Sequence, residues 1–280
     1  MFKLKKKKLI KIHSHSPLLS FVYLAKTDIL TVHDGMYYQA KTSNHKFLFL
    51  YSLVERVVYC KVRMVHFISE FTKSKSLYPV AWKNSIIIYN TSHFESRYAD
   101  LLPINILGIN NKALKVLCVR SIEARARFDL LLEVAPLIVD CGVQFIVAGK
   151  GPLLTKYRTQ VVEKDIKNIT FLGYVTDETL IDLYHECDLV LVLAEFGEGF
   201  GLPIIEGYLF NKPVIASNVC AIPEVIIDQS FLTNNTTQEI VHKLKSFKNL
   251  PRLKFREYYD QNFSSHLILD MFRTLYQSIT

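Results

Sequence analysis

Short apolar runs rich in β-branched residues recur through the second half of the chain, separated by segments in which hydrophobic positions have helical spacing. The runs are Val116–Val119, Phe145–Ala148, Ile169–Leu172, Leu189–Leu193 and Val214–Ala216. They do not alternate between apolar and polar residues, which is typical of strands buried on both faces. Strand–helix alternation at this spacing predicts a parallel, doubly wound sheet.

The segments between these runs carry signals for helix starts and ends. Phe128–Asp140 has helical periodicity, but Pro136 must kink or shorten that helix. Thr176 is a good N-cap for a second helix. Pro203 is well suited to the first position of a third, which has to end before Pro213.

The first hundred residues repeat this pattern more loosely. The predicted strands are Ile10–His13, Ile29–His33, Met64–Ile68 and Ile86–Tyr89, with a helix over Phe47–Cys60. Residues 101–111 are typical of a linker, and a last helix is predicted over Ser264–Gln277. We therefore predict a small N-terminal domain (1–103), a larger second domain (104–262) and a C-terminal helix (263–280) that packs back on the first domain.

The distribution of charge also divides the chain. Half of the 280 residues are apolar and 21% are charged, which excludes disordered and collagen-like proteins. The first 100 residues hold 16 basic and 6 acidic side chains, and the other 180 hold 18 and 20. A basic first third suits acidic lipid headgroups or a phosphorylated ligand. The basic run at residues 3–8 has no nucleic-acid motif beside it, so we expect no nucleic-acid partner and a solvated tail.

Cysteine usage and hydropathy favour the cytoplasm. No stretch approaches the about 18 consecutive apolar residues of a membrane span, and the N-terminus lacks a signal-peptide core. The five cysteines are widely spaced without a Cys-x-x-Cys pair, which is typical of a reducing compartment. His13 and His15 share one face of a strand, but no set of residues has zinc-finger spacing, so no metal is expected.

The chemistry is predicted at residues 195–207, where Gly197, Gly199 and Gly201 follow a buried strand and precede the helix that Pro203 opens. Such a turn lets the backbone approach a ligand, and it directs free N–H groups and the positive helix end at an anion, most often a phosphate. In a doubly wound sheet this site lies at the carboxyl ends of the strands.

Two carboxylates bracket that turn, Glu198 before the helix and Glu206 in its first turn. Ionised carboxylates only accept hydrogen bonds, so hydroxyl groups of a sugar or ribose on either side of a phosphate are natural partners. The alternative is that both acids only interact favourably with the positive end of the helix dipole.

The stretch Glu198-Gly-Phe-Gly-Leu-Pro-Ile-Ile-Glu206 resembles the Glu-x7-Glu motif of the retaining glycosyltransferases of family 4. Four further segments are similar to that family in the same order: 147–152, 171–175, 186–188 and 212–225. The resemblance covers roughly residues 105–280. It implies the GT-B fold of the α/β class, in which two Rossmann-like, doubly wound parallel-sheet domains face a cleft.

The resemblance also implies roles for individual residues. Glu198 would orient the donor sugar, and Glu206 would bind the ribose. Arg120 matches the family arginine that neutralises the leaving diphosphate. Val119 replaces the usual glycine, and no lysine follows, so either Arg125 or Arg127 would substitute for it. The remaining donor-binding positions, near the diphosphate or the base, are Gly149, Gly173, Tyr174, Val175, Gly199, Phe200, Gly201 and Leu202.

In the first domain, the sequence around His33 resembles the family strand whose terminal histidine reaches the transferred sugar. Family members usually begin with a strand, a Gly-rich loop and a helix ahead of the residues that match Ile12–Ser16. We expect this domain to be shortened, with its acceptor side incomplete and a sheet edge left to cover.

Three hypotheses follow. The first is an enzyme of cell-envelope glycan synthesis that moves a hexose from a nucleotide-diphosphate sugar to a glycan, lipid-linked or other hydroxyl acceptor. It would act with retention of configuration, without a metal or other cofactor, in the cytoplasm or at the inner face of the membrane. The second is a non-catalytic or split nucleotide-sugar-binding subunit that needs a partner chain. The third is an epimerase with the same fold or a dinucleotide-dependent oxidoreductase. The oxidoreductase is poorly supported, because no Gly-x-Gly-x-x-Gly motif opens the chain and Glu198 and Glu206 would have no role in it.

Overall fold

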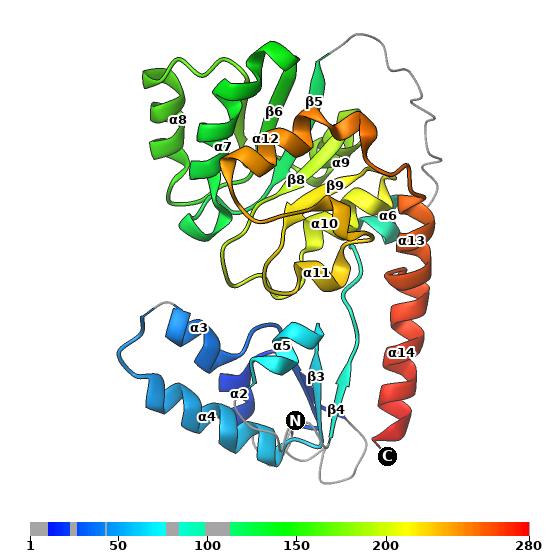
Figure 1. Ribbon diagram of the computed structural model, residues 1–280. Helices are drawn as coiled ribbons and strands as arrows, with labels where there is room; N and C mark the ends of the chain where they lie inside the picture. Colours follow the sequence, from blue (N-terminus) through cyan, green and yellow to red (C-terminus); the bar gives the residue numbers. More distant parts are fainter. Residues whose placement is uncertain (1–10, 23–26, 43, 77–83, 99–112, 280) are drawn as a thin grey trace. The chain divides into compact units, whose positions relative to one another are not determined.

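The chain divides into two α/β units, Met1–Asn90 with His266–Thr280 and Thr91–Ser265 (Figure 1). The computed structural model describes residues 11–22, 27–42, 44–76, 84–98 and 113–279 (Figure 1). The basic run at residues 3–8, the predicted linker and the predicted domain limit at 103 lie outside the described residues. All the strand pairs in both units are parallel, as the non-alternating apolar runs predict.

The first unit contains a four-stranded sheet in the order β1-β2-β3-β4. The strands are β1 (His13–Ser14), β2 (Ile29–Val32), β3 (Met64–Phe67) and β4 (Ser85–Ile87). All four predicted strands are present. β1 covers His13–Ser14 instead of the predicted Ile10–His13, and Ile10 lies outside the described residues. The helices of this unit are α2 (Pro17–Val22), α3 (Met36–Thr42), α4 (Leu48–Lys61), α5 (Glu70–Ser74) and α14 (Ser265–Ser278).

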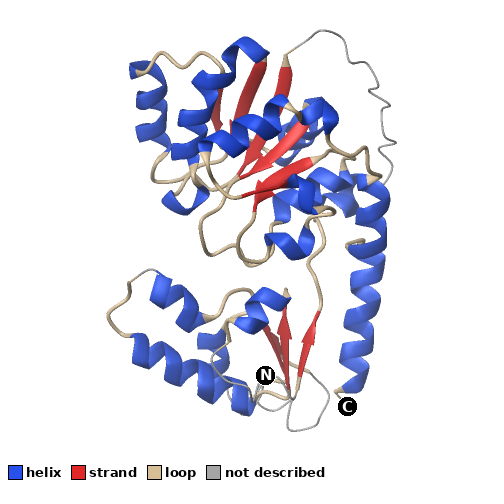
Figure 2. Cartoon of the chain, viewed as in Figure 1, coloured by secondary structure: helices blue, strands red, loops and turns tan. Residues whose placement is uncertain are grey.

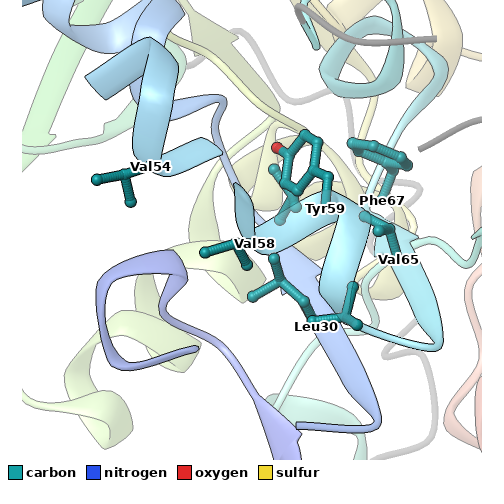
Figure 3. Close-up of a cluster of buried hydrophobic side chains, with 8 residues drawn as sticks. Leu30, Val54, Val58, Tyr59, Val65 and Phe67 are labelled. Atoms are coloured by element: carbon teal, nitrogen blue, oxygen red, sulfur yellow. The ribbon is translucent and has the colours of Figure 1, made fainter. Parts of the chain in front are cut away.

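Both faces of this sheet are covered by helices. On one face, α4 packs Val54, Val58 and Tyr59 against side chains of β2 and β3 (Figure 3). On the other face, Ile268 and Leu275 of α14 pack on Ile29 of β2 and on Ile88. Neighbouring residues of β2 therefore enter two different cores, which explains why the strand is apolar at consecutive positions.

The second unit contains a six-stranded sheet in the order β10-β9-β8-β5-β6-β7, drawn as red arrows in Figure 2. Its strands are β5 (Leu114–Val119), β6 (Val143–Ala148), β7 (Ile169–Gly173), β8 (Leu189–Val192), β9 (Val214–Ser217) and β10 (Leu232–Thr233). The first five coincide with the predicted runs, and β10 was not predicted. The α-helices are α6 (Phe94–Tyr98), α7 (Phe128–Val134), α8 (Leu154–Glu163), α9 (Asp177–Glu186), α10 (Leu202–Leu209), α11 (Ile222–Val225), α12 (Thr237–Lys245) and α13 (Phe255–Asn262).

Helix ends in this unit follow the local signals. The predicted helix over Phe128–Asp140 is α-helical only to Val134 and continues as the 3-10 segment η3 (Ala135–Cys141), with Pro136 in its first turn. The Thr176 hydroxyl accepts a hydrogen bond from the Thr179 N–H and caps α9, as predicted. α10 ends at Leu209, shortly before Asn211 with a φ of 56°.

Hydrogen bonds place residues 91–98 in the second unit, ahead of the predicted limit at 103. The Glu95 carboxylate accepts hydrogen bonds from the Tyr259 hydroxyl at 2.8 Å and from the backbone N–H of Ser265 at 2.6 Å. The local sequence does not predict these contacts, because the partners of Glu95 lie more than 160 positions away along the chain.

A directed chain of hydrogen bonds ties α14 to the sheet of the first unit. His66 Nε2 donates to the Ile88 carbonyl, and burial lowers the pKa of His66 to about 4, so its Nδ1 is an acceptor. The Thr31 hydroxyl therefore donates to His66 Nδ1 at 2.8 Å and accepts from His13 Nε2 at 2.6 Å. His13, with a pKa also lowered to about 4, then accepts from the Tyr276 hydroxyl through Nδ1. The chain is complete only when both imidazoles are neutral.

Acid should therefore weaken the first unit. The unfolded chain binds protons at these histidines below about pH 6.5, whereas the folded chain resists them down to about pH 4. The free energy of unfolding is therefore highest above pH 6.5 and decreases as the pH falls toward 4. For His66 alone this decrease is on the order of 3 kcal/mol. Thermal unfolding at pH 7 and pH 5 measures the loss. His66→Gln should reduce this pH dependence, and exposed His266→Gln should not. Equal pH dependence in all three proteins would contradict the assignment.

Candidate functional site

The predicted site residues of the second unit gather at the carboxyl edge of its sheet. The chain runs from β5 to β6 and β7 on one side, and then crosses to β8 and β9 on the other side of β5. Ligands of such sheets bind where this direction reverses, outside the carboxyl ends of the two central strands. Here those strands are β5 and β8. Arg120 follows β5 directly, and Glu198 lies in the turn that follows β8.

Arg120 and Glu198 form an ion pair across this reversal. Arg120 Nη2 donates to Glu198 Oε2 at 2.6 Å, and the two side chains are only 9% and 15% exposed. Arg120 Nη1 is buried and has no hydrogen-bond partner among the described residues. A buried guanidinium N–H without an acceptor is costly, so this edge holds a donor suited to an anionic ligand.

The turn 195–201 is shaped by glycines. Gly197 and Gly201 have φ values of 68° and 100°, which other residues rarely adopt. A Cβ on Gly201 would also lie 2.9 Å from the Ile204 side chain. The Glu198 carbonyl accepts a hydrogen bond from the Ala221 N–H, which ties the turn to the segment after β9. Gly199 and Phe200 belong to the same turn, and the Phe200 ring is buried against Phe263, so its side chain does not face a ligand.

Glu206 is not in the first turn of α10, contrary to the prediction. α10 begins at Leu202, so Glu206 is its fifth residue. Its side chain is 6% exposed and accepts a hydrogen bond from the Tyr184 hydroxyl at 2.7 Å. Burial raises the pKa of Glu206 to about 7. Glu206 therefore changes protonation near neutral pH, and the Tyr184 contact favours its ionised form.

The two candidate arginines have different surroundings. Arg125 Nη1 donates to the Gly197 carbonyl at 2.6 Å, so this side chain reaches the glycine turn. Arg127 forms a two-pronged contact with Asp129, and its own backbone is in the left-handed region with a φ of 51°. Of the two, Arg125 is the one in contact with the turn.

The ends of β6 and β7 complete this edge. The Gly149 N–H donates to the Gly173 carbonyl at 2.8 Å, and both glycines have positive φ. Tyr174 is 71% exposed, Val175 is half-buried, and Lys150 Nζ lies 5.2 Å from the centre of the Tyr174 ring. A cation and an exposed aromatic ring therefore lie beside the end of β7, which the family resemblance associates with the base.

His33 belongs to the first unit and is described with it. It follows β2, is exposed, and its Nε2 lies 3.1 Å from Nδ1 of His15, with the two rings stacked. Partial burial and the positive charge that His15 can carry lower the pKa of His33. Within the described residues, no group of three or more His, Cys, Asp or Glu side chains is arranged to hold a metal ion.

Comparison with known proteins assigns the family. The sequence profile of the Glycosyl transferases group 1 family matches residues 104–265, more than half of the chain. The chain belongs to this family.

Two relatives and one solved structure illustrate the match. The O-antigen chain mannosyltransferase B of Escherichia coli is 26% identical over 199 residues, which are 67% of this chain and 52% of the relative. The poly(ribitol-phosphate) alpha-N-acetylglucosaminyltransferase of Staphylococcus aureus is 28% identical over 165 residues, 54% of this chain and 33% of the relative. The chain thus spans about half of these curated relatives, or less.

The fold of Anabaena Alr3699/HepE, solved in complex with UDP and glucose, superposes with a TM-score of 0.71. That alignment covers 94% of this chain and 74% of the other, at 16% identity. Together with the two parallel sheets, it shows that this group 1 chain has the GT-B type of fold.

Three residues to which the sequence analysis assigned no site role also shape this edge of the sheet. The Ser217 hydroxyl accepts from the Ala194 N–H and donates to Asn235 Oδ1, while Asn235 Nδ2 donates to the Ala194 carbonyl. This pair fixes the backbone where β8 enters the glycine turn. Lys150 is the third. In the sequence, its position directly after a glycine at the end of a predicted strand could have indicated that Lys150 belongs to the site.

Gly149→Ala should disrupt the site of this group 1 chain through the backbone. A Cβ there would lie 1.9 Å from the Arg120 carbonyl oxygen, so β5 and β6 would have to separate. We expect a loss of roughly 3 kcal/mol or more in the free energy of unfolding, as for other severe backbone conflicts. Gly142→Ala is the control: its nearest neighbour is 3.7 Å away, and only a φ of 69° opposes it, at a cost of about 1 kcal/mol. Chemical denaturation compares the two, and equal losses would contradict this account.

Proposed function

We propose that this chain transfers a sugar from a nucleotide-diphosphate sugar to an acceptor hydroxyl with retention of configuration, as a family 4 type of hexosyltransferase. The observation that carries the proposal is the Arg120–Glu198 pair at the reversal between β5 and β8, with a buried guanidinium N–H left over. An arginine donor and a carboxylate acceptor side by side suit a ligand that carries phosphate next to sugar hydroxyls.

In this proposal the diphosphate lies against Arg120 and the turn at Gly199 and Gly201, near the start of α10. The Arg125 side chain at the Gly197 carbonyl supplies further positive charge. Negative charge that builds up on the departing diphosphate is stabilised there by guanidinium groups and backbone N–H donors. Because these cations belong to the protein, we propose that no metal ion is required.

Glu198 would hold hydroxyls of the transferred sugar, Glu206 the ribose, and Gly173, Tyr174 and Val175 the base. His33 of the first unit would contact the sugar. The bond between the anomeric carbon and the diphosphate oxygen breaks, and the acceptor oxygen bonds to that carbon on the same face. The acceptor proton passes to the departing diphosphate, so no separate protein base is needed.

The names of the relatives support a cell-envelope glycan as the acceptor, since they act on O-antigen chains and poly(ribitol-phosphate). We propose a lipid-linked or phosphorylated acceptor at the inner face of a membrane, which the basic first hundred residues also favour. No helix of the described residues is long and apolar enough to cross a bilayer.

A second candidate function is a nucleotide-sugar-binding subunit that acts only with a partner chain. The observation that favours it is that the residues proposed to hold the donor, other than His33, all lie in the second unit, so donor binding does not require the acceptor side. Donor binding without turnover, followed by turnover when a companion chain is added, would select this second function.

Different variants should impair donor binding and sugar transfer separately. Arg120→Met should raise the Kd for UDP at least about tenfold, because it removes charged hydrogen bonds. Glu198→Gln should change that Kd only a few-fold and reduce transfer or donor hydrolysis about a hundredfold. Calorimetry and a coupled UDP-release assay measure the two effects. Glu163→Gln, on the exposed end of α8, is the control. Wild-type turnover in Glu198→Gln would contradict the assigned role.

Ribose binding at Glu206 should release a proton. The free protein holds Glu206 partly protonated near neutral pH, because burial raises its pKa to about 7. Hydroxyl donors favour the ionised carboxylate and lower that pKa, so binding of UDP at pH 6.5 should expel up to one proton. Calorimetry in buffers of different ionisation enthalpy counts it. Glu206→Gln should release fewer protons than wild type, and equal release would place the ribose elsewhere.

A further inference from the structure

One helix of the first unit is apolar on its outer face as well as its inner face. Val54 and Val58 of α4 are buried in the core, whereas Phe47, Phe49, Leu50 and Leu53 are exposed at its N-terminal end. Phe49 is 81% exposed. Phe49 and Val58 are nine positions apart, about half a turn around the helix axis, so they point in opposite directions. We call Phe47, Phe49, Leu50 and Leu53 the α4 apolar patch.

The exposed charged residues of the helix hairpin that carries the α4 apolar patch are of one sign. Lys41, Lys46, Arg56 and Lys61 lie on the same helix hairpin, and all are exposed. The only acid between residues 36 and 61 is Glu55, which is buried and accepts a hydrogen bond from the Tyr59 hydroxyl. Burial also raises the pKa of Glu55, so the carboxylate adds little negative charge to this surface. The hairpin from α3 to α4 thus combines exposed basic side chains with protruding Phe and Leu side chains.

We propose that the α4 apolar patch docks on an anionic lipid surface, with its four side chains in the headgroup and acyl boundary and Lys41, Lys46 and Arg56 against lipid phosphates. Phe and Leu on one face with basic residues beside them are typical of helices that lie in a membrane interface. A second copy of the chain fits less well, because a two-fold interface would bring the same basic side chains together.

The docking surface itself is inferred from the exposed residues of α4. Only its purpose, to bring the chain to a lipid-linked acceptor, rests on the proposed function. The docking surface lies in the first unit, and the proposed donor residues other than His33 lie in the second. Loss of docking and loss of donor binding can therefore be measured separately.

The test is sedimentation of the whole chain with vesicles of phosphatidylcholine, alone or mixed in equal parts with phosphatidylglycerol. Wild type should bind the mixed vesicles at least about tenfold better, and salt should weaken the binding.

Phe49→Ser with Leu53→Ser should reduce binding at least about tenfold, because each of these side chains contributes roughly that factor when it leaves water. Lys46→Glu should reduce it about fivefold or more. Val162→Ser, at a residue 80% exposed on α8, is the matched control and should bind like wild type.

Two further measurements keep the outcomes separate. The Phe49→Ser, Leu53→Ser variant should unfold at the wild-type temperature and keep the wild-type Kd for UDP, since the changed residues are exposed. Unchanged vesicle binding in that variant would overturn the docking proposal, as would wild-type protein that fails to bind the mixed vesicles. A concentration-dependent dimer that this variant abolishes, without vesicle binding, would overturn it in favour of a second copy. Docking by a chain that binds none of the nucleoside diphosphates UDP, GDP and ADP would instead contradict the proposed function.

Discussion

The pairing of Arg120 with Glu198 depends on the whole topology of the second unit. Arg120 follows β5 and Glu198 follows β8, and only the crossing of the chain between β7 and β8 makes these two strands neighbours. The remaining features of the edge support that pair. Gly149 allows β6 to approach the Arg120 carbonyl, and Arg125 holds the glycine turn at Gly197. A buried cation and carboxylate are stable together and costly apart, so this edge tolerates little rearrangement without a ligand.

The two units use buried polar groups in different ways. In the second unit, the Tyr184 hydroxyl donates a hydrogen bond to the buried Glu206 carboxyl, whose pKa burial raises to about 7. In the first unit, Thr31 lies between two neutral imidazoles and completes a hydrogen-bond chain from α14 to β3. The first arrangement leaves a carboxyl that titrates near neutral pH, whereas the second keeps a distant segment of the chain on its sheet.

Local patterns predicted most of the regular structure. The continuous apolar runs became the parallel strands, Thr176 capped α9, and Pro136 ended the α-helical part of its segment. The short helices around Met36 and Glu70 and the position of Glu206 within α10 were missed or misplaced, since helix ends depend on contacts that no local window contains. The choice between Arg125 and Arg127 was open in the sequence, because both lie in one short loop, and the orientation of that loop depends on the strands beside it.

The sequence by itself determined the strand–helix alternation, the glycine turn with its two acids, and membership in the Glycosyl transferases group 1 family. These are properties of residues close together along the chain, where backbone preference and hydrophobic period act directly. Tertiary structure decided the contacts between residues far apart. Arg120 is 78 positions from Glu198 and His13 is 263 positions from Tyr276, and strand order and helix packing alone bring such groups within hydrogen-bond distance.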